Sequence, residues 1–304
     1  MKKKSLITIN SLSDETLDKL IQLAVDVKAD RSKYSESLKG KNLALLFEKP
    51  STRTRVSFEV GINQLGGNSF YLVPSALQPG KRESLKDIAQ TLSRYLDCLV
   101  LRTFKHESIL EVDRYCSIPV INGLSDFSHP CQALADYLTI YEKFPNQEDI
   151  KVAYVGDGNN VVHSLMILLA RKGVDFTVST PAEYAPRKDV IEHARAHAEK
   201  MGARLEFITD PNEGVRNADI VYTDVWVSMG EEKAGKDSSV FESYQVNSEL
   251  LSHAKKEAYV MHCLPAYRGK EITDEVMDSE HAIVFDQAEN RLHAQKAVLI
   301  HLLS

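Results

Sequence analysis

Apolar residues along this chain follow two patterns, short continuous runs and stretches with helical spacing. The short runs predict strands covered on both faces, near residues 43–47, 69–72, 98–101, 118–121, 152–155, 175–179, 204–208, 219–223, 258–262 and 282–285. Between them, apolar residues recur at the i, i+3, i+4 and i+7 positions of amphipathic helices, expected over 11–28, 85–96, 132–144 and 288–302. Strands that alternate with helices in this way predict an α/β fold with parallel sheets.

The alternation is interrupted at Pro145-Asn146-Gln147, and a second series begins with the apolar run Val152–Val155. A chain of 304 residues is long enough for about two domains. We therefore expect two doubly wound parallel-sheet domains, residues 1–145 and 146–287, with the active site in the crevice between them. The last helix, 288–304, is expected to pack back on the first domain.

Composition and charge narrow the class of protein. The 43% hydrophobic and 26% charged residues are typical of a globular protein, and the net charge of −6 argues against a nucleic-acid partner. No run has the length of a membrane helix, and too few apolar residues follow Met1-Lys2-Lys3-Lys4 for a signal peptide. The cysteines, which are Cys98, Cys116, Cys131 and Cys263, show no CxxC spacing. We expect a cytoplasmic protein without a structural metal.

Unusual polar residues gather just past the carboxyl ends of the expected strands. These segments are Ser51 to Arg55, Arg102, His129 to Gln132, Asp157 to Asn160, Asp224 to Gly230 and His262 to Pro265. In open α/β sheets, ligands bind outside the carboxyl ends of the strands. The positions therefore predict one large site shared between two domains.

Ser51-Thr52-Arg53-Thr54-Arg55 lies where a strand gives way to a helix. The free backbone N–H groups and the helix dipole at such a junction favour an anion, and Ser, Thr and Arg add donors that match phosphate. The segment predicts a phosphate site. From these five residues alone, a capped helix with two exposed arginines is an equally good interpretation.

Gly156-Asp157-Gly158-Asn159-Asn160 follows a strand, as in dinucleotide-binding turns. However, the third glycine of that pattern falls at Val161, and the next strand ends without a ribose-binding acid. A tight turn that offers Asn160 to a ligand fits better, and a nucleotide-dependent dehydrogenase is disfavoured.

His129-Pro130-Cys131-Gln132 places an imidazole before a helix and a carboxamide in its first turn. His129 is suited to polarise a carbonyl group, and the amide oxygen of Gln132 is suited to accept from an N–H of the same ligand. Taken alone, a capping His129 and a solvated Gln132 are the favoured interpretation.

His262-Cys263 suggests a nucleophile with its base, but adjacent residues at a strand end point to opposite sides. Cys263 is therefore predicted to contact a ligand rather than to attack it. Asp224 opens an aperiodic stretch to Ser239 that is typical of a lid. Asp224 is a candidate to hold an ammonium group, with a cap or turn role equally open.

Taken together, four segments resemble the ornithine carbamoyltransferases over essentially the whole chain. They are Phe47-Glu48-Lys49-Pro50 with Ser51-Thr52-Arg53-Thr54-Arg55, then His129-Pro130-Cys131-Gln132, Asp224 with Ser228-Met229-Gly230, and His262-Cys263-Leu264-Pro265. The first two are shared by carbamoyltransferases generally, and the last two indicate ornithine.

The resemblance implies a role for each matching residue. Carbamoyl phosphate would be bound by Ser51, Thr52, Arg53, Thr54, Gln78, Arg102, His129, Gln132, Cys263, Leu264 and Arg291. Ornithine would be bound by Asn160, Asp224, Ser228 and Met229. Arg102, His129 and Cys263 would act in the reaction itself. Gln78 would reach into a neighbouring subunit's site, within a homotrimer or a multiple of trimers.

The implied reaction moves the carbamoyl group of carbamoyl phosphate to the δ-amino group of L-ornithine. Such a pre-activated donor requires oxyanion stabilisation and alignment, so no cofactor or metal is expected. Residues 224–239 are expected to close after carbamoyl phosphate binds. A carbamoyltransferase for putrescine or another amine is the alternative. A non-catalytic relative is disfavoured because Arg55, Arg102, His129 and Cys263 are all present.

Overall fold

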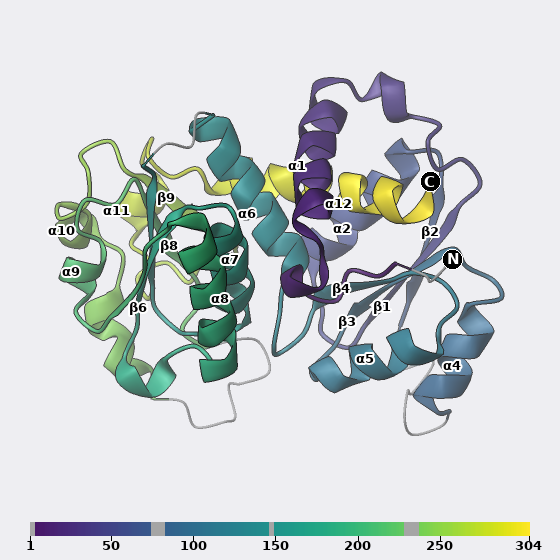
Figure 1. The fold of residues 1–304 in the computed structure, drawn as a ribbon, viewed down its shortest axis with the longest axis horizontal. Helices are drawn as coiled ribbons and strands as arrows, with labels where there is room; N and C mark the ends of the chain where they lie inside the picture. The colour runs from purple at the N-terminus through teal and green to yellow at the C-terminus, as the bar shows by residue number, and fades with distance from the viewer. Residues whose placement is uncertain (1–3, 74–82, 146–148, 228–236) are drawn as a thin grey trace. The chain divides into compact units, whose positions relative to one another are not determined.

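The computed structural model describes residues 4–73, 83–145, 149–227 and 237–304 (Figure 1). The chain divides into two compact units, one formed by Met1–Leu138 with Asn290–Ser304 and the other by Thr139–Glu289. Each contains one parallel sheet, which confirms the predicted fold class of two parallel α/β domains. The predicted boundaries of the two substrate-binding domains stay a prediction.

The first unit contains a four-stranded sheet in the order β2-β1-β3-β4. Its strands are β1 (Asn42–Phe47), β2 (Asn68–Leu72), β3 (Cys98–Arg102) and β4 (Val120–Leu124). Its helices are η1 (Ile9–Ser11), α1 (Asp14–Ala29), η2 (Ser32–Tyr34), α2 (Thr52–Gln64), α4 (Leu85–Leu92) and α5 (His106–Tyr115). Helices α6 (Pro130–Lys143) and α12 (Val284–Leu303) have residues in both units.

Both faces of the first sheet are covered. Ala44, Leu46, Leu99 and Leu101 form a buried cluster with apolar residues of α4 and α5. On the opposite face lie α1, α2 and the last turns of α12 (Figure 1). Cover on both faces explains why β1 and β3 are continuous apolar runs rather than alternating ones.

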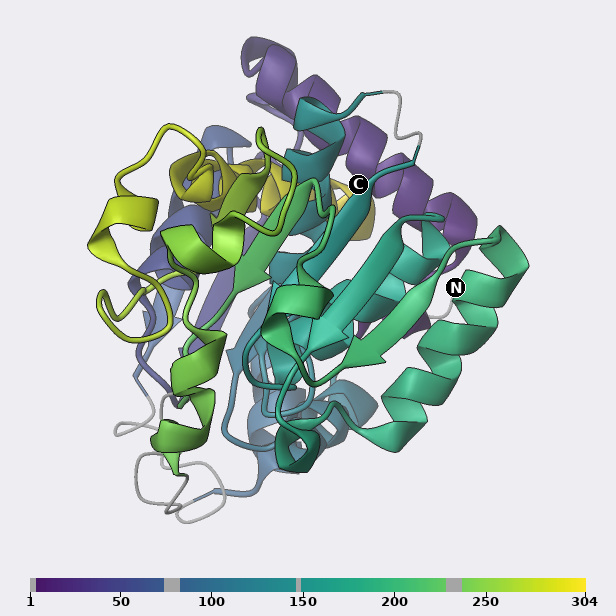
Figure 2. The same cartoon turned by 90° about the vertical axis from the view of Figure 1, so that its left-hand side faces the viewer.

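The second unit contains a five-stranded sheet in the order β7-β6-β5-β8-β9 (Figure 2). Its strands are β5 (Lys151–Val155), β6 (Asp175–Ser179), β7 (Leu205–Ile208), β8 (Ile220–Thr223) and β9 (Tyr259–His262). Its helices are α7 (Asn160–Arg171), η3 (Ala182–Tyr184), α8 (Lys188–Met201), α9 (Pro211–Gly214), η4 (Ser238–Tyr244), α10 (Ser248–Leu251) and α11 (Asp274–Met277). Residues of β5, β8 and β9 pack on α10 and α11, whereas α7 and α8 lie on the other face (Figure 1).

One expected strand, 282–285, is wrong. Ala282 makes an isolated parallel bridge with Val260, and helix α12 begins two residues later at Val284. A short apolar run suits a buried strand and a helix start equally well, and its periodicity does not separate them. No helix in the described ranges has both the length and the apolar character needed to cross a membrane.

Candidate functional site

In the first unit, the predicted segments follow three adjacent strands. The phosphate segment follows β1, Arg102 ends β3, and His129 to Gln132 comes after β4. Because β1, β3 and β4 are neighbours in a parallel sheet, their carboxyl ends meet at one edge.

The start of α2 has the geometry of an anion site. Ser51 is the N-cap residue, and its Oγ accepts from the backbone N–H of Thr54 at 3.3 Å. Thr54 is buried, Ser51 and Arg53 are half-buried, and Thr52 is exposed. Backbone N–H groups, hydroxyls and a guanidinium at a helix N-terminus together favour a phosphate.

Arg291 joins two of the predicted segments. Its Nη2 donates to Oγ1 of Thr54 at 3.1 Å, and its Nη1 donates to Oε1 of Gln132 at 2.5 Å. The amide Nε2 of Gln132 donates in turn to Oδ1 of Asp136. The Gln132 oxygen that was expected to face a ligand therefore accepts from Arg291 in this structure. The planar guanidinium suits this role because it offers donors in a fixed fork.

His129 and Arg102 are both buried. Burial lowers the pKa of His129 well below its ordinary value of 6.5, and the positive charges of Arg291 and Arg102 lower that pKa further. The imidazole is therefore neutral at physiological pH. A neutral imidazole can donate one hydrogen bond toward a carbonyl oxygen without adding a third positive charge.

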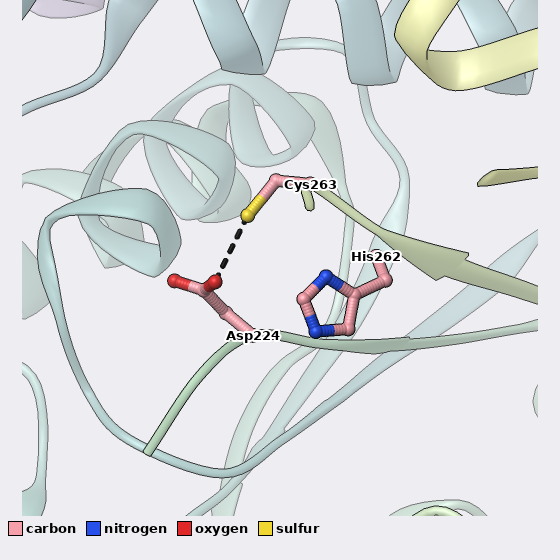
Figure 3. A group of neighbouring side chains, drawn as sticks. All are labelled: Asp224, His262 and Cys263. Carbon is pink, nitrogen blue, oxygen red and sulfur yellow. Dashed lines mark hydrogen bonds between the residues drawn. The ribbon is translucent and has the colours of Figure 1, made fainter. Parts of the chain in front are cut away.

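In the second unit, the predicted segments follow β5, β8 and β9, which are also neighbours in their sheet. Asp224 comes directly after β8, and its Oδ1 accepts from the Sγ of Cys263 at 2.9 Å (Figure 3). Its Oδ2 accepts from Nδ2 of Asn159 at 2.8 Å. Asp224 is buried, so these two donors compensate for the water that its carboxylate has lost. Asn160 follows Asn159 in the chain, is the first residue of α7 and is also buried.

Asp224, His262 and Cys263 each offer a ligand atom, and these atoms lie within 4.8 Å of one another. Such a set is able to bind a soft divalent cation. However, both ring nitrogens of His262 already have partners, the backbone N–H of Leu264 and the carboxylate of Glu271. A metal bound here would have to displace one of them.

Asn159 lies in a polar segment that the sequence predicted, but no role of its own was predicted for it. Its side chain caps α7, since Oδ1 accepts from the backbone N–H groups of Val161 and Val162, and it also holds Asp224. An asparagine before a helical stretch is a recognisable N-cap signal, but its second partner lies 65 residues further along the chain. The predicted residues Gln78, Ser228 and Met229 lie outside the described residues.

Two parallel α/β units with polar residues at the carboxyl ends of adjacent strands are typical of two-domain α/β enzymes. Two models from one family match this chain, "Aspartate/ornithine carbamoyltransferase, carbamoyl-P binding domain" over residues 4–142 and "Aspartate/ornithine carbamoyltransferase, Asp/Orn binding domain" over residues 148–302. The chain belongs to the aspartate/ornithine carbamoyltransferase family, as its sequence predicted.

Individual relatives indicate which members of the family this chain resembles. An ornithine carbamoyltransferase of Archaeoglobus fulgidus is 50% identical over 304 residues, which cover 99% of this chain and 97% of that protein. A protein of Thermoplasma volcanium named as a catabolic ornithine carbamoyltransferase is 46% identical, with full coverage of both chains. The solved structure of ornithine carbamoyltransferase from Pyrococcus furiosus has a TM-score of 0.94 at 47% identity, covering 97% of this chain and 96% of that one. These names agree with the predicted activity.

Proposed function

We propose that this protein transfers the carbamoyl group of carbamoyl phosphate to the δ-amino group of L-ornithine, giving L-citrulline and phosphate. The observation that carries the proposal is the likeness, along the whole chain, to relatives named ornithine carbamoyltransferase. Each half also matches a family domain of the corresponding substrate type.

Carbamoyl phosphate is proposed to bind the first unit at residues 51–54. The N-terminus of α2 and the side chains of Ser51, Thr52 and Arg53 would hold the phosphate. Arg102, His129 and Gln132 would surround the carbamoyl group. Arg291 supports this arrangement because it already holds Thr54 and Gln132. Cys263 and Leu264, together with Gln78 of a neighbouring subunit, complete the proposed set.

Ornithine is proposed to bind the second unit through Asp224. A carboxylate has about four lone-pair positions, so Asp224 retains room for the α-ammonium group after accepting from Asn159 and Cys263. Asn160, Ser228 and Met229 complete the proposed contacts to ornithine.

The proposed reaction proceeds by acyl transfer. The neutral δ-amine forms a bond to the carbamoyl carbon, and the carbonyl oxygen takes up negative charge. Arg102 and neutral His129 would stabilise that oxyanion with hydrogen bonds. The intermediate then breaks its bond to the phosphate oxygen, the nitrogen loses a proton, and phosphate leaves. The departing phosphate is the proposed acceptor of that proton.

We propose a homotrimer or a multiple of trimers. Exposed apolar side chains of the first unit support this proposal, since Val56 and Val60 of α2, Phe70 of the edge strand β2 and Val73 just after that strand are 38% to 49% exposed. Arg55 of α2 stacks over the ring of Tyr71 at 3.9 Å, which links the two elements. Exposed apolar groups of this kind are typical of interaction surfaces.

The proposed setting is arginine biosynthesis in the cytoplasm. All four cysteines are free thiols, as is usual in a reducing compartment. The T. volcanium relative is named as a catabolic enzyme, so the direction in which this protein runs the reaction should be measured. Comparing citrulline formation with citrulline phosphorolysis, at matched substrate concentrations, measures that preference.

The proposed function is tested by measuring carbamoylated product with ornithine, putrescine and aspartate offered in parallel. We expect turnover with ornithine far above the other two. His129→Ala should lower kcat by about 10²-fold or more if the imidazole acts on the transition state. Faster turnover with putrescine would show that ornithine is not the acceptor. A raised KM with unchanged kcat in His129→Ala would show that His129 does not stabilise the transition state.

A further inference from the structure

His262 and Glu271 form a buried pair in the second unit, with side chains 0% and 1% exposed. Nε2 of His262 lies 3.1 Å from Oε1 of Glu271. On the other side of the ring, Nδ1 lies 2.9 Å from the backbone nitrogen of Leu264. A backbone N–H can only donate, so Nδ1 is the acceptor and the ring proton is on Nε2, where it is donated to Glu271.

Leu264 needs such a contact because its backbone is strained. Its φ angle is +59°, in the left-handed region that side chains with a Cβ rarely adopt. The φ angle is the torsion about the N–Cα bond of Leu264, and the hydrogen bond to His262 restrains the nitrogen of that bond. Glu271 holds the same loop from its other end, since Oε1 also accepts from the backbone N–H of Tyr267. The pair therefore fixes the path of residues 263–267.

The loop held in this way carries two residues of the proposed site. Cys263 lies between His262 and the strained Leu264, and its Sγ donates to Asp224. In Figure 3 the dashed hydrogen bond joins Cys263 to Asp224, and none joins His262 to Cys263. Contact with the thiol is therefore not how His262 acts on the loop. It acts through the backbone.

We infer that His262 and Glu271 are positioning residues: the Nε2–H imidazole, anchored by Glu271, fixes the backbone of Leu264 and so sets Cys263 and Leu264 in place for carbamoyl transfer. This inference rests on the proposed function. It predicts which atom of His262 matters. The Nδ1 acceptor holds Leu264, and the Nε2 donor only orients the ring.

Matched substitutions separate the two nitrogens. In His262→Asn, the amide oxygen can occupy the Nδ1 position and accept from Leu264, whereas His262→Gln reaches only the Nε2 position. Glu271→Gln keeps an acceptor oxygen for His262 and Tyr267, and Glu271→Met removes it. His253→Gln, at an exposed histidine of the same unit, is the control for loss of an imidazole.

We expect kcat to fall by about 10²-fold in His262→Gln and Glu271→Met, because misplacing reacting groups by about 1 Å has an effect of that size. His262→Asn and Glu271→Gln should restore most of the activity, and the KM for carbamoyl phosphate should change less than kcat. If His262→Gln does not fold, the activities of Glu271→Met and Glu271→Gln still compare loss with retention of the acceptor that anchors the ring.

A second measurement does not depend on the proposed function. Cys263 is the half-exposed cysteine, while Cys98, Cys116 and Cys131 are buried, so its alkylation by iodoacetamide can be followed by mass spectrometry. Its rate should rise by about tenfold in His262→Gln and Glu271→Met, because the thiol loses its fixed carboxylate partner. Equal activities and unchanged alkylation across the four variants would overturn the inference, whereas absent ornithine turnover in the unaltered protein with faster alkylation would overturn only the proposed function.

Discussion

Asn159 and Asp224 are joined by one hydrogen bond, from Nδ2 of the amide to Oδ2 of the carboxylate at 2.8 Å. The same amide caps α7 through its oxygen, which accepts from Val161 and Val162. The side chain of Asn159 thus orients both the N-terminus of α7 and the carboxylate of Asp224, which is proposed to bind ornithine. The cap ties the position of Asp224 to the backbone of α7 rather than to a flexible side chain.

Replacing Asn159 separates these two tasks. Asn159→Asp keeps an oxygen that can cap α7 but sets a second negative charge against Asp224, while Asn159→Ser keeps a shorter cap that does not reach it. We expect Asn159→Asp to raise the KM for ornithine by about 10- to 100-fold, as the loss of a charge-assisted hydrogen bond of about 1.5–3 kcal/mol implies. The KM for carbamoyl phosphate should not change. An unaltered ornithine KM would show that Asp224 needs no such support.

Arg291→Lys tests the fork between Thr54 and Gln132. A lysine is a point charge and does not reproduce two fixed donors. We expect kcat/KM for carbamoyl phosphate to fall by about 10²-fold, equivalent to about 2.7 kcal/mol. Arg216→Lys is the matched control, since Arg216 forms an exposed ion pair with Glu213. Equal effects of the two substitutions would exclude a specific role for the fork.

His129 makes stability depend on pH. Its folded-state pKa is far below 6.5, so between that lowered pKa and 6.5 the unfolded chain binds a proton that the folded protein does not. The contribution of His129 to the free energy of unfolding is therefore constant above about pH 6.5. As the pH falls below that value, the free energy of unfolding decreases by up to about 1.4 kcal/mol per pH unit. Urea unfolding between about pH 7 and about pH 5 should show a smaller loss in His129→Gln than in the unaltered protein. Parallel losses would assign the acid sensitivity to other groups.

Val60→Glu and Phe70→Glu test the proposed trimer surface. A charge placed in an apolar contact would lose its hydration without gaining a partner, so light scattering should show monomers. Met201→Glu, at a similarly exposed residue of the second unit, should leave the assembly intact. An unchanged mass in all three variants would place the subunit contact elsewhere.

The sequence predicted the positions of polar residues better than their partners. Strand ends can be read from apolar runs, so the segments at residues 51–55 and 262–265 were found in the right structural context. Which strands are neighbours is a tertiary property, and the bond from Asn159 after β5 to Asp224 after β8 depends on that order. Arg291 was reached only through family resemblance, because it lies 159 residues beyond Gln132 in the chain.

The first unit is built from both ends of the chain, because Asn290–Ser304 belongs to it. Gly61 of α2 packs against Leu292 and Lys296, and Nζ of Lys296 donates to Gln64. Domains generally fold as the ribosome delivers them, N-terminal first, but this one lacks Arg291 and the cover of α2 until residues 290–304 have been translated, after the whole second unit. The unit that is started first is therefore completed last, so a nascent or C-terminally truncated chain presents an open apolar face to chaperones and proteases.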